Sequence, residues 1–189
     1  HTHVNGTGCA DYGDILIMPT VGEQVYKNQD FSSQSLPYAS SFSHENEVAV
    51  PGYYSVILDR YSVKAELSAT KRAAIHRYTF PESTESGFIV DMDYSIQRQD
   101  NLDMHIDVLS DTELCGYKLT KYWAFDQRIC FYAKFSKPFS YEIYTDTLTD
   151  SKGKQQALYK ALLKFDTKKD EQVFVKVGIS AGDVDGGQK

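Results

Sequence analysis

The stretch FSHENEVAVPGYYSVILDRYSVKAELSATKRAAIHRYTFP, residues 42–81, decides the fold of this chain. Apolar and aromatic residues alternate with polar ones from residue 54 to 58 and again from residue 75 to 79, so the period is two and not 3.6. This period predicts paired β-strands with one buried face and one face free for water or chemistry. The predicted strands carry most of the reactive side chains of the stretch, which are His44, Glu45, Arg72 and His76.

Further short strands, separated by turn signals, follow residue 81, and one strand at residues 14–20 precedes the stretch. This spacing is typical of a β-sandwich, and 189 residues suffice for one large all-β domain. Residues 155–165 fit either a helical stripe or a strand. We favour a strand, because the turn at residues 168–170 and a clear strand at 172–179 follow and would complete a hairpin.

Composition excludes two classes of partner. A formal charge of -6, with lysines and arginines scattered along the chain, leaves no basic patch for a nucleic acid. No apolar run approaches the roughly 20 residues that a membrane helix needs. The three cysteines, Cys9, Cys115 and Cys130, allow at most one disulfide. We expect free thiols, because a hairpin turning near residues 124–126 would place Cys115 nearer to Lys134 than to Cys130.

Three loops frame the predicted strands. Residues 1–13 combine three glycines with small polar residues, which indicates a tight loop whose backbone can approach another surface closely. Residues 23–41 are polar and interrupted by Pro37, as in a surface loop that shapes a site. The tail at 181–189 has no apolar face to bury and is expected to be a frayed end or the start of a linker. Because the chain starts without a methionine, we expect a processed or excised piece.

Several residue groups have both a chemical and a structural interpretation. Fourteen tyrosines, most of them on predicted strands, suit stacking on sugars or packing within a sheet. His1 and His3 could converge with His44 and His76 on a divalent metal, or all four could be hydrogen-bonded residues near a sheet end.

Two pairs of acids each share a strand face in the predicted sheet: Asp91 with Asp93, and Glu45 with Glu47. Paired carboxylates can cleave glycosides, but same-face neighbours can equally be solvated. The chain contains no nucleophile elbow, no C-x-x-C pair and no helical H-E-x-x-H pattern, so a self-contained enzyme is hard to build from it.

Four blocks of the sequence resemble the N-terminal domain of glycoside hydrolase family 92, in the order of that family. They are HTHVNGTGCADYGDILIMPT, the 42–81 stretch, CGYKLTKYWAFDQRICFYAKFSKPF and VFVKVGIS, and together they span nearly the whole chain. Small departures are Asn5 for a commoner serine, and Ser62 and Ala74 for usual glycines. After Ser180 the likeness fades, so the domain is expected to cover residues 1–181, incomplete at its N-terminal side, with 182–189 as a tail or linker.

The resemblance implies a large two-sheet antiparallel β-sandwich of the galactose-mutarotase-like supersandwich type. It also implies a parent enzyme that is a bacterial, calcium-dependent, inverting exo-α-mannosidase, located in the periplasm, at the outer cell surface or outside the cell. The catalytic acid and base, and most calcium contacts, would belong to an (α/α)6 domain that follows this chain. No catalytic residue and no metal ligand is expected within these 189 residues.

Carried over residue by residue, the resemblance implies that the glycine-rich loop walls the pocket for a mannose-containing glycan, through His3, Asn5, Gly6, Thr7, Gly8 and Cys9. His44, Glu45, Arg72 and His76 match the second block as supporting residues, either near the sugar or in a buried polar network. The expected role is therefore scaffold and one wall of an active site. Two other functions remain open, a free-standing carbohydrate-binding module and a β-barrel protein with a histidine-bound metal.

Overall fold

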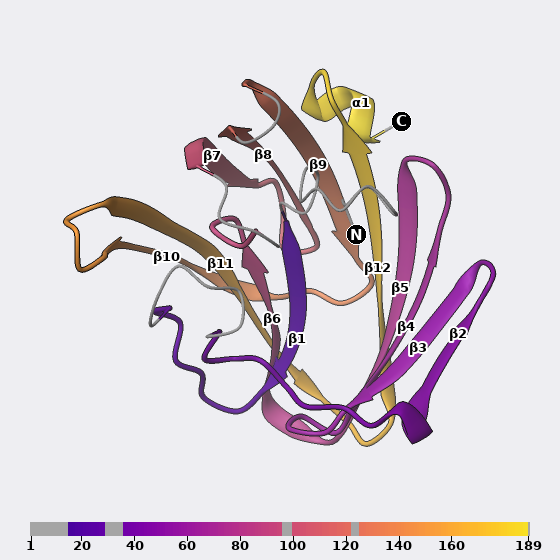
Figure 1. Cartoon of the computed structure of the whole chain (residues 1–189). Helices are drawn as coiled ribbons and strands as arrows, with labels where there is room; N and C mark the ends of the chain where they lie inside the picture. The colour runs from indigo at the N-terminus through magenta and orange to yellow at the C-terminus, as the bar shows by residue number, and fades with distance from the viewer. Residues whose placement is uncertain (1–14, 29–35, 96–99, 122–124, 189) are drawn as a thin grey trace.

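The alternating pattern produces two antiparallel β-sheets in the part of the chain that the structure, a computed structural model, describes: residues 15–28, 36–95, 100–121 and 125–188. Figure 1 shows the sheets packed face to face. The all-β sandwich predicted from the sequence is confirmed. Within the described residues no helix is long and apolar enough to span a membrane.

The larger sheet has eight strands and the smaller has four. In spatial order the larger sheet contains β2 (Glu47–Val50), β3 (Tyr53–Leu58), β4 (Val63–Ala69), β5 (Ala73–Phe80), β12 (Glu171–Ser180), β9 (Gln127–Phe135), β8 (Glu113–Lys121) and β7 (Asp100–Val108). The smaller sheet contains β1 (Leu16–Val21), β6 (Ser83–Asp91), β11 (Gln155–Thr167) and β10 (Ser140–Thr149). Two short helices complete the described elements, the 3-10 helix η2 (His44–Asn46) and α1 (Val184–Gln188).

The strand predicted at residues 155–165 is confirmed as β11, but the hairpin with its successor is wrong. β11 pairs with β10 and β6, whereas β12 pairs with β5 and β9 in the other sheet. The turn at residues 168–170, with Asp170 at a φ of 58°, carries the chain from one sheet to the other. Figure 1 shows this crossing at the bottom of the sandwich. Alternation predicts a strand but does not specify which strand it pairs with.

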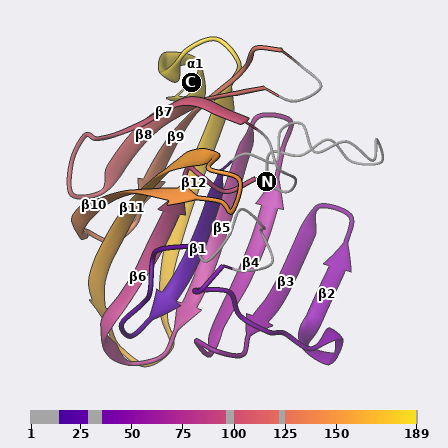
Figure 2. The same cartoon turned by 60° about the vertical axis from the view of Figure 1, so that its left-hand side comes forward.

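The 42–81 stretch is less central than its patterning indicated. Of its four strands, β2 lies at the edge of the larger sheet, where Val48 and Val50 are exposed, and only β5 pairs with the interior strand β12. Figure 2 shows β2 and β3 at one side of the molecule. The prediction that His44 and Glu45 lie on a strand is wrong, because both belong to η2, which is capped by the Ser43 hydroxyl accepting from the Glu45 N–H.

The two cysteines in the described part are free thiols, as expected. Cys115 lies opposite Tyr132 in the β8–β9 ladder, and Cys130 lies opposite Tyr117. Both thiols are buried. Cys9 lies outside the described residues.

The end of the chain rests on the larger sheet. A methyl group at Gly178 of β12 would lie 1.8 Å from the Gly187 carbonyl oxygen, so only a glycine lets the backbone of α1 come this close. The Cys130 Sγ contacts the Gly182 carbonyl oxygen at 3.9 Å. The backbone therefore stays near the sheet after β12 ends, while the domain boundary expected near residue 181 stays a prediction.

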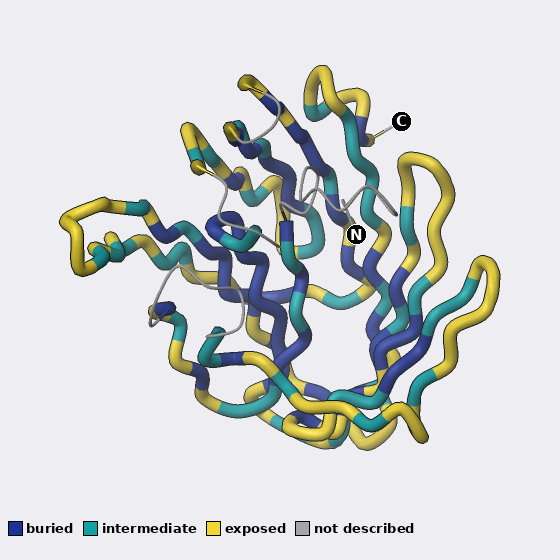
Figure 3. Tube along the Cα trace, in the orientation of Figure 1, coloured by how far each residue is buried: buried dark blue, intermediate teal, exposed yellow. Residues whose placement is uncertain are grey.

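The core lies between the sheets and is dominated by aromatic rings. Phe88 of β6 contacts Tyr78, Phe80, Phe135 and Phe165, with ring centroids 5.0 to 5.7 Å apart. All five side chains are buried, and Figure 3 shows the dark interior that they share with other strands. Edge-to-face and tilted packing of this kind adds to the free energy gained by burying apolar area.

We expect Phe88→Ala to lower the free energy of unfolding by about 3–5 kcal/mol, because it leaves a cavity at the centre of the ring cluster. Urea unfolding followed by circular dichroism measures the loss. Phe125→Ala is the matched control, since that ring is 78% exposed and its removal should change stability by less than about 0.5 kcal/mol. Equal effects of the two substitutions would contradict this assignment of the core.

Candidate functional site

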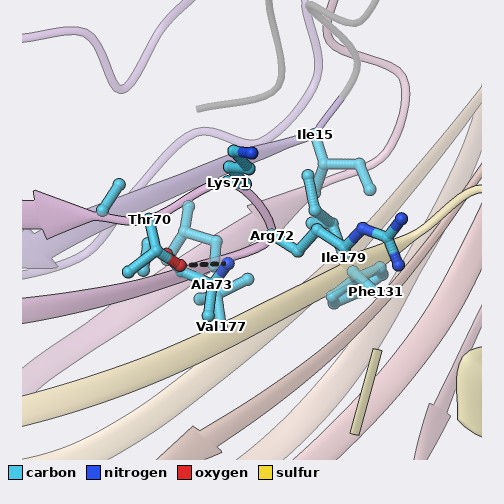
Figure 4. A pocket seen from close by; sticks show the side chains of 11 residues that line it. Ile15, Thr70, Lys71, Arg72, Ala73, Phe131, Val177 and Ile179 are labelled. Carbon is cyan, nitrogen blue, oxygen red and sulfur yellow. Dashed lines mark hydrogen bonds between the residues drawn. The ribbon is translucent and has the colours of Figure 1, made fainter. Parts of the chain in front are cut away.

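Within the part of the chain that the structure describes, a pocket of about 70 Å³ lies between β1 of the smaller sheet and the β4–β5 turn of the larger one. Its apolar floor includes Ile15, Phe131, Val177 and Ile179. Its rim is the turn at residues 70–72. Figure 4 shows the Arg72 side chain extending along Ile179 and Phe131. We call this opening the mouth of the sandwich.

The rim turn is held by short-range hydrogen bonds. The Thr70 N–H donates to the Ala73 carbonyl oxygen at 2.7 Å, and the Ala73 N–H donates to the Thr70 hydroxyl at 3.3 Å. The Arg72 carbonyl oxygen accepts from the Ile179 N–H at 2.9 Å, which ties the turn to β12. Arg72 itself is exposed. The turn therefore presents a guanidinium with five N–H donors at the edge of an apolar pocket.

A wider groove continues from the mouth along the inner face of the larger sheet. It is lined by Tyr54, Leu67 and His76 among others, and it shares Ala69 and Ala74 with the first pocket. Figure 1 shows β2 and β3 projecting beyond β1, the edge of the smaller sheet. The inner face of these strands is consequently accessible, and small alanine side chains would let another surface approach closely.

His76 is the only supporting residue of the four that lies on a strand. Its ring is fully buried on β5 and packs edge-on against Tyr78, whose hydroxyl is 3.1 Å from His76 Nδ1. Burial lowers the pKa of His76 to about 4, so the ring is neutral at pH 7. This residue braces the floor of the groove.

The other supporting residues do not join His76. His44 and Glu45 are exposed at the start of β2, and the His44 Nδ1 lies 2.5 Å from the Glu47 carboxylate. Figure 1 shows that end of the sheet far from the β4–β5 turn, where Arg72 lies. The structure brings only Arg72 and His76 to the same side of the sheet, along the mouth and its groove. His3, Asn5, Gly6, Thr7, Gly8 and Cys9 lie outside the described residues, in the segment that precedes Ile15.

Several tyrosine hydroxyls in the described strands form hydrogen bonds to side chains of the same domain. Tyr53, Tyr54, Tyr117 and Tyr144 each donate to a nearby carboxylate at 2.7 to 3.0 Å. These pairs fix side chains across and along the sheets. These four of the fourteen tyrosines therefore have hydrogen-bond partners within the protein.

The acid pairs of the sequence have separate outcomes. Glu45 and Glu47 do not share a strand face, because Glu45 lies in η2 and Glu47 begins β2. Asp91 and Asp93 do not share a strand face either, because β6 ends at Asp91, but both carboxylates contact Lys160 of β11. The Lys160 Nζ lies 3.0 Å from Asp91 Oδ2 and 2.6 Å from Asp93 Oδ2, and none of the three side chains is more than 3% exposed.

Sequence reasoning missed Lys160, although a signal for it existed. Lys160 interrupts the alternating apolar positions Leu158 and Leu162 on one face of β11. Lys160 is the direct cross-strand partner of Asp91. A lysine in an apolar row, with acids in the neighbouring strand, indicates a buried ion pair once the register is known.

The acid pair is closed to a substrate. Asp91 accepts from the Tyr38 hydroxyl and from the backbone N–H groups of residues 93 and 94. Asp93 accepts from the Asn28 amide and the Tyr159 N–H, both at 2.9 Å. Every carboxylate oxygen is therefore occupied inside the protein. Elsewhere in the described residues no group of three histidines, cysteines or acids could hold a metal ion.

Replacing Lys160 with methionine should destabilise the fold by about 3–5 kcal/mol, because it leaves two buried carboxylates without their cation. Chemical unfolding at pH 7.5 measures this change. Lys154→Met removes an exposed ion pair with Asp100 and should cost at most about 1 kcal/mol. A Lys160→Met protein as stable as the unmutated chain would refute the role of Lys160 as the shared cation of the two buried acids.

Comparisons with known proteins agree with one another. The model of the glycosyl hydrolase family 92 N-terminal domain matches residues 1–180. The structure of the family GH92 alpha-mannosidase BT3965 from Bacteroides thetaiotaomicron, in complex with mannoimidazole, matches 99% of the chain at 33% identity and a TM-score of 0.86. The family GH92 inverting mannosidase BT2199 from the same organism matches 94% at 25% identity and a TM-score of 0.66.

The GH92 glycosyl hydrolase ccman5 shares the fold, with a TM-score of 0.77 at 23% identity. The chain spans 26% of the length of BT3965 and 23% of BT2199. No curated protein matches it.

Proposed function

The chain belongs to glycoside hydrolase family 92 as its N-terminal domain, and from this premise we propose that it is the non-catalytic half of an inverting exo-α-mannosidase acting on glycans. It would supply scaffold and one wall of the active site. The similarity to BT3965, an α-mannosidase, and to BT2199, an inverting mannosidase, supports this reaction class. The chain spans only about a quarter of these proteins, so the catalytic groups would come from the remainder.

The observation that carries the proposal is the state of the Asp91–Asp93 pair. An inverting glycosidase keeps its acid and base about 6.5–9.5 Å apart, so that a water molecule fits between the base and the sugar. Here a single ammonium bridges both carboxylates within 3.0 Å, and both are buried. This pair cannot perform the reaction, which favours an acid and a base from the (α/α)6 domain that the family resemblance implies.

We assign the wall of the active site to the mouth of the sandwich. It combines an apolar floor, the exposed Arg72 and the start of β1, which the glycine-rich loop precedes in the chain. In the proposed arrangement residues 3–9 and the rim turn face the rest of the polypeptide and the glycan. The groove along Leu67 and His76 adds apolar area for contact with that partner.

Calcium is the cofactor that the resemblance implies, and the described residues do not offer it a cage. They contain no cluster of three acidic or other metal-ligating side chains. Calcium prefers six to eight oxygen ligands. As the resemblance implies, most of its ligands would belong to the remainder of the parent enzyme. Location in the periplasm, at the cell surface or outside the cell belongs to the same proposal.

The 189-residue chain alone should not hydrolyse an aryl α-mannoside, with or without millimolar calcium, because its buried acid pair is inaccessible. Release of the chromophore measures turnover, and the full-length enzyme is the positive control. Measurable turnover would overturn the assignment. Calorimetry with mannose and mannan addresses the other function, since saturable binding by the chain alone would favour a free-standing carbohydrate-binding module.

In the full-length enzyme, alanine at His3, Asn5 and Thr7 should lower kcat/KM by about tenfold or more, because each polar contact to substrate contributes roughly 1 kcal/mol. Alanine at Ser151, Lys152 and Lys154, in the exposed β10–β11 turn, provides the control. Unchanged kinetics in the loop variant would mean that the domain only holds its neighbour.

A further inference from the structure

The buried ionic cluster of Asp91, Asp93 and Lys160 lies beneath a covering segment, by which we mean the described residues 22–28 and 36–41. This segment crosses the outer face of the smaller sheet, where Tyr38 packs with Ile89 and Leu162 in a second small core. Figure 2 shows it passing in front of β6. Two of its side chains reach into the cluster, Asn28 to Asp93 and Tyr38 to Asp91. The cluster therefore fastens the segment to the sheet.

The charges in this cluster do not balance when both acids are ionised. Two carboxylates face one ammonium, so the buried group carries one unbalanced negative charge, which is costly away from water. The other groups that face the pair are neutral phenols, one amide and backbone N–H donors. They are Asn28 and Tyr38 of the covering segment, Tyr94 just after β6, Tyr144 of β10 and Tyr159 of β11. A further buried cation, Lys118 of β8, lies beside them and donates to the Tyr94 carbonyl oxygen at 2.6 Å.

The pKa values of the two carboxyl groups are shifted in opposite directions. Burial acts to raise the pKa of Asp91, but the Lys160 ammonium and the Tyr38 hydrogen bond outweigh it and hold that pKa below its usual range. Burial, and then the negative charge of Asp91, raise the pKa of Asp93 to about 7 despite Lys160. Asp93 is therefore the group that accepts a proton.

Asn28 provides a place for that proton. Its Nδ2 donates to Asp93 Oδ2 at 2.9 Å, while its Oδ1 is buried and has no hydrogen-bond partner among the described residues. If the carboxamide turns over, Oδ1 can accept a hydrogen bond from a protonated Asp93. Asn28 can thus serve both states of the carboxyl.

We propose that the Asp91–Lys160–Asp93 cluster is a pH-dependent fastening of the covering segment. With Asp93 protonated the cluster is neutral and holds Asn28 and Tyr38 against the sheet. With Asp93 ionised the buried negative charge weakens this contact, and transient opening, which admits water to the carboxylates, becomes more frequent. This device is independent of the proposed function, because it requires neither a glycan nor the rest of the enzyme.

The direction of the pH effect follows from proton linkage. In the open state Asp93 is solvated, with a pKa near the usual 3.8, whereas in the closed state the pKa is about 7. The closed state is favoured fully below pH 4 and loses this advantage as pH rises to 7. Between these values the opening constant should rise by about tenfold per pH unit, because one proton is released, and it should level off above pH 7.

Amide hydrogen exchange of the chain measures this opening. The Tyr159 N–H donates to Asp93 Oδ1 and reports on the cluster. The reference is the Thr70 N–H, which donates to the Ala73 carbonyl oxygen in the β4–β5 turn, because opening of that turn leaves the cluster closed. After correction for the intrinsic exchange rate, the ratio of the Tyr159 to the Thr70 opening constants should rise about tenfold per unit from pH 5 to 7. A ratio that stays constant over this range would overturn the proposal.

Asp93→Asn removes the titrating group while Asp91 still pairs with Lys160, so the ratio should become independent of pH. Asp146→Asn is the matched control. It removes the exposed contact between β10 and Lys27 of the covering segment, and the pKa of Asp146 is about 2, so the slope should persist. Retention of the slope in Asp93→Asn, or its loss in Asp146→Asn, would contradict the proposal.

A direct titration keeps the proposal testable if Asp93→Asn fails to fold. The ¹³C shift of the Asp93 side-chain carboxyl in the unmutated chain should titrate with a midpoint near pH 7, because burial and Asp91 disfavour its charged form. The Asp91 carboxyl should stay ionised throughout pH 5–8. An Asp93 carboxyl that is ionised at pH 5 would refute the mechanism.

Discussion

Packing of a four-stranded sheet against an eight-stranded one is the constraint on which the rest of this molecule depends. The smaller sheet covers one part of the larger, and there the aromatic rings around Phe88 fill the space between them. Past β1 the inner face of the larger sheet has no opposing strands among the described residues. That unequal coverage leaves the mouth and its groove, with the Arg72 turn at their edge. The opening is a consequence of sheet size and not of any particular reactive residue.

Polar groups inside the domain are arranged for support. The phenols of Tyr53 and Tyr54 donate to Glu66 and Glu47, and Arg77 holds Glu66 through two bonds of 2.7 Å. The bond from Arg77, with help from Tyr53, lowers the pKa of Glu66 to about 2 even though burial opposes it. Such carboxylates are held ionised by partners within the domain. In this pattern the polar side chains hold neighbouring strands together.

The cluster under the covering segment differs in one respect, which is its charge. Most ion pairs described here match one acid with one base at the surface, where water screens them. Lys160 is shared by two buried acids, so the protonation state of Asp93 decides whether the cluster is neutral. Stability and titration are therefore coupled at this place in the fold.

The sequence by itself determined the class of the fold and the family. Period-two alternation predicted the strands at residues 54–58 and 75–79, which are part of β3 and β5, and the four blocks are long enough to identify the family domain. Tertiary structure alone decided which strands pair, because register and sheet membership depend on contacts between distant residues. It separated β11 from β12 and placed His44 and Glu45 in the 3-10 helix η2. It also placed Arg72 at the mouth and His76 in the groove. It also gave Asp91 and Asp93 their shared cation, since Lys160 is 67 residues from Asp93 in the chain and reaches it only through the β6–β11 ladder.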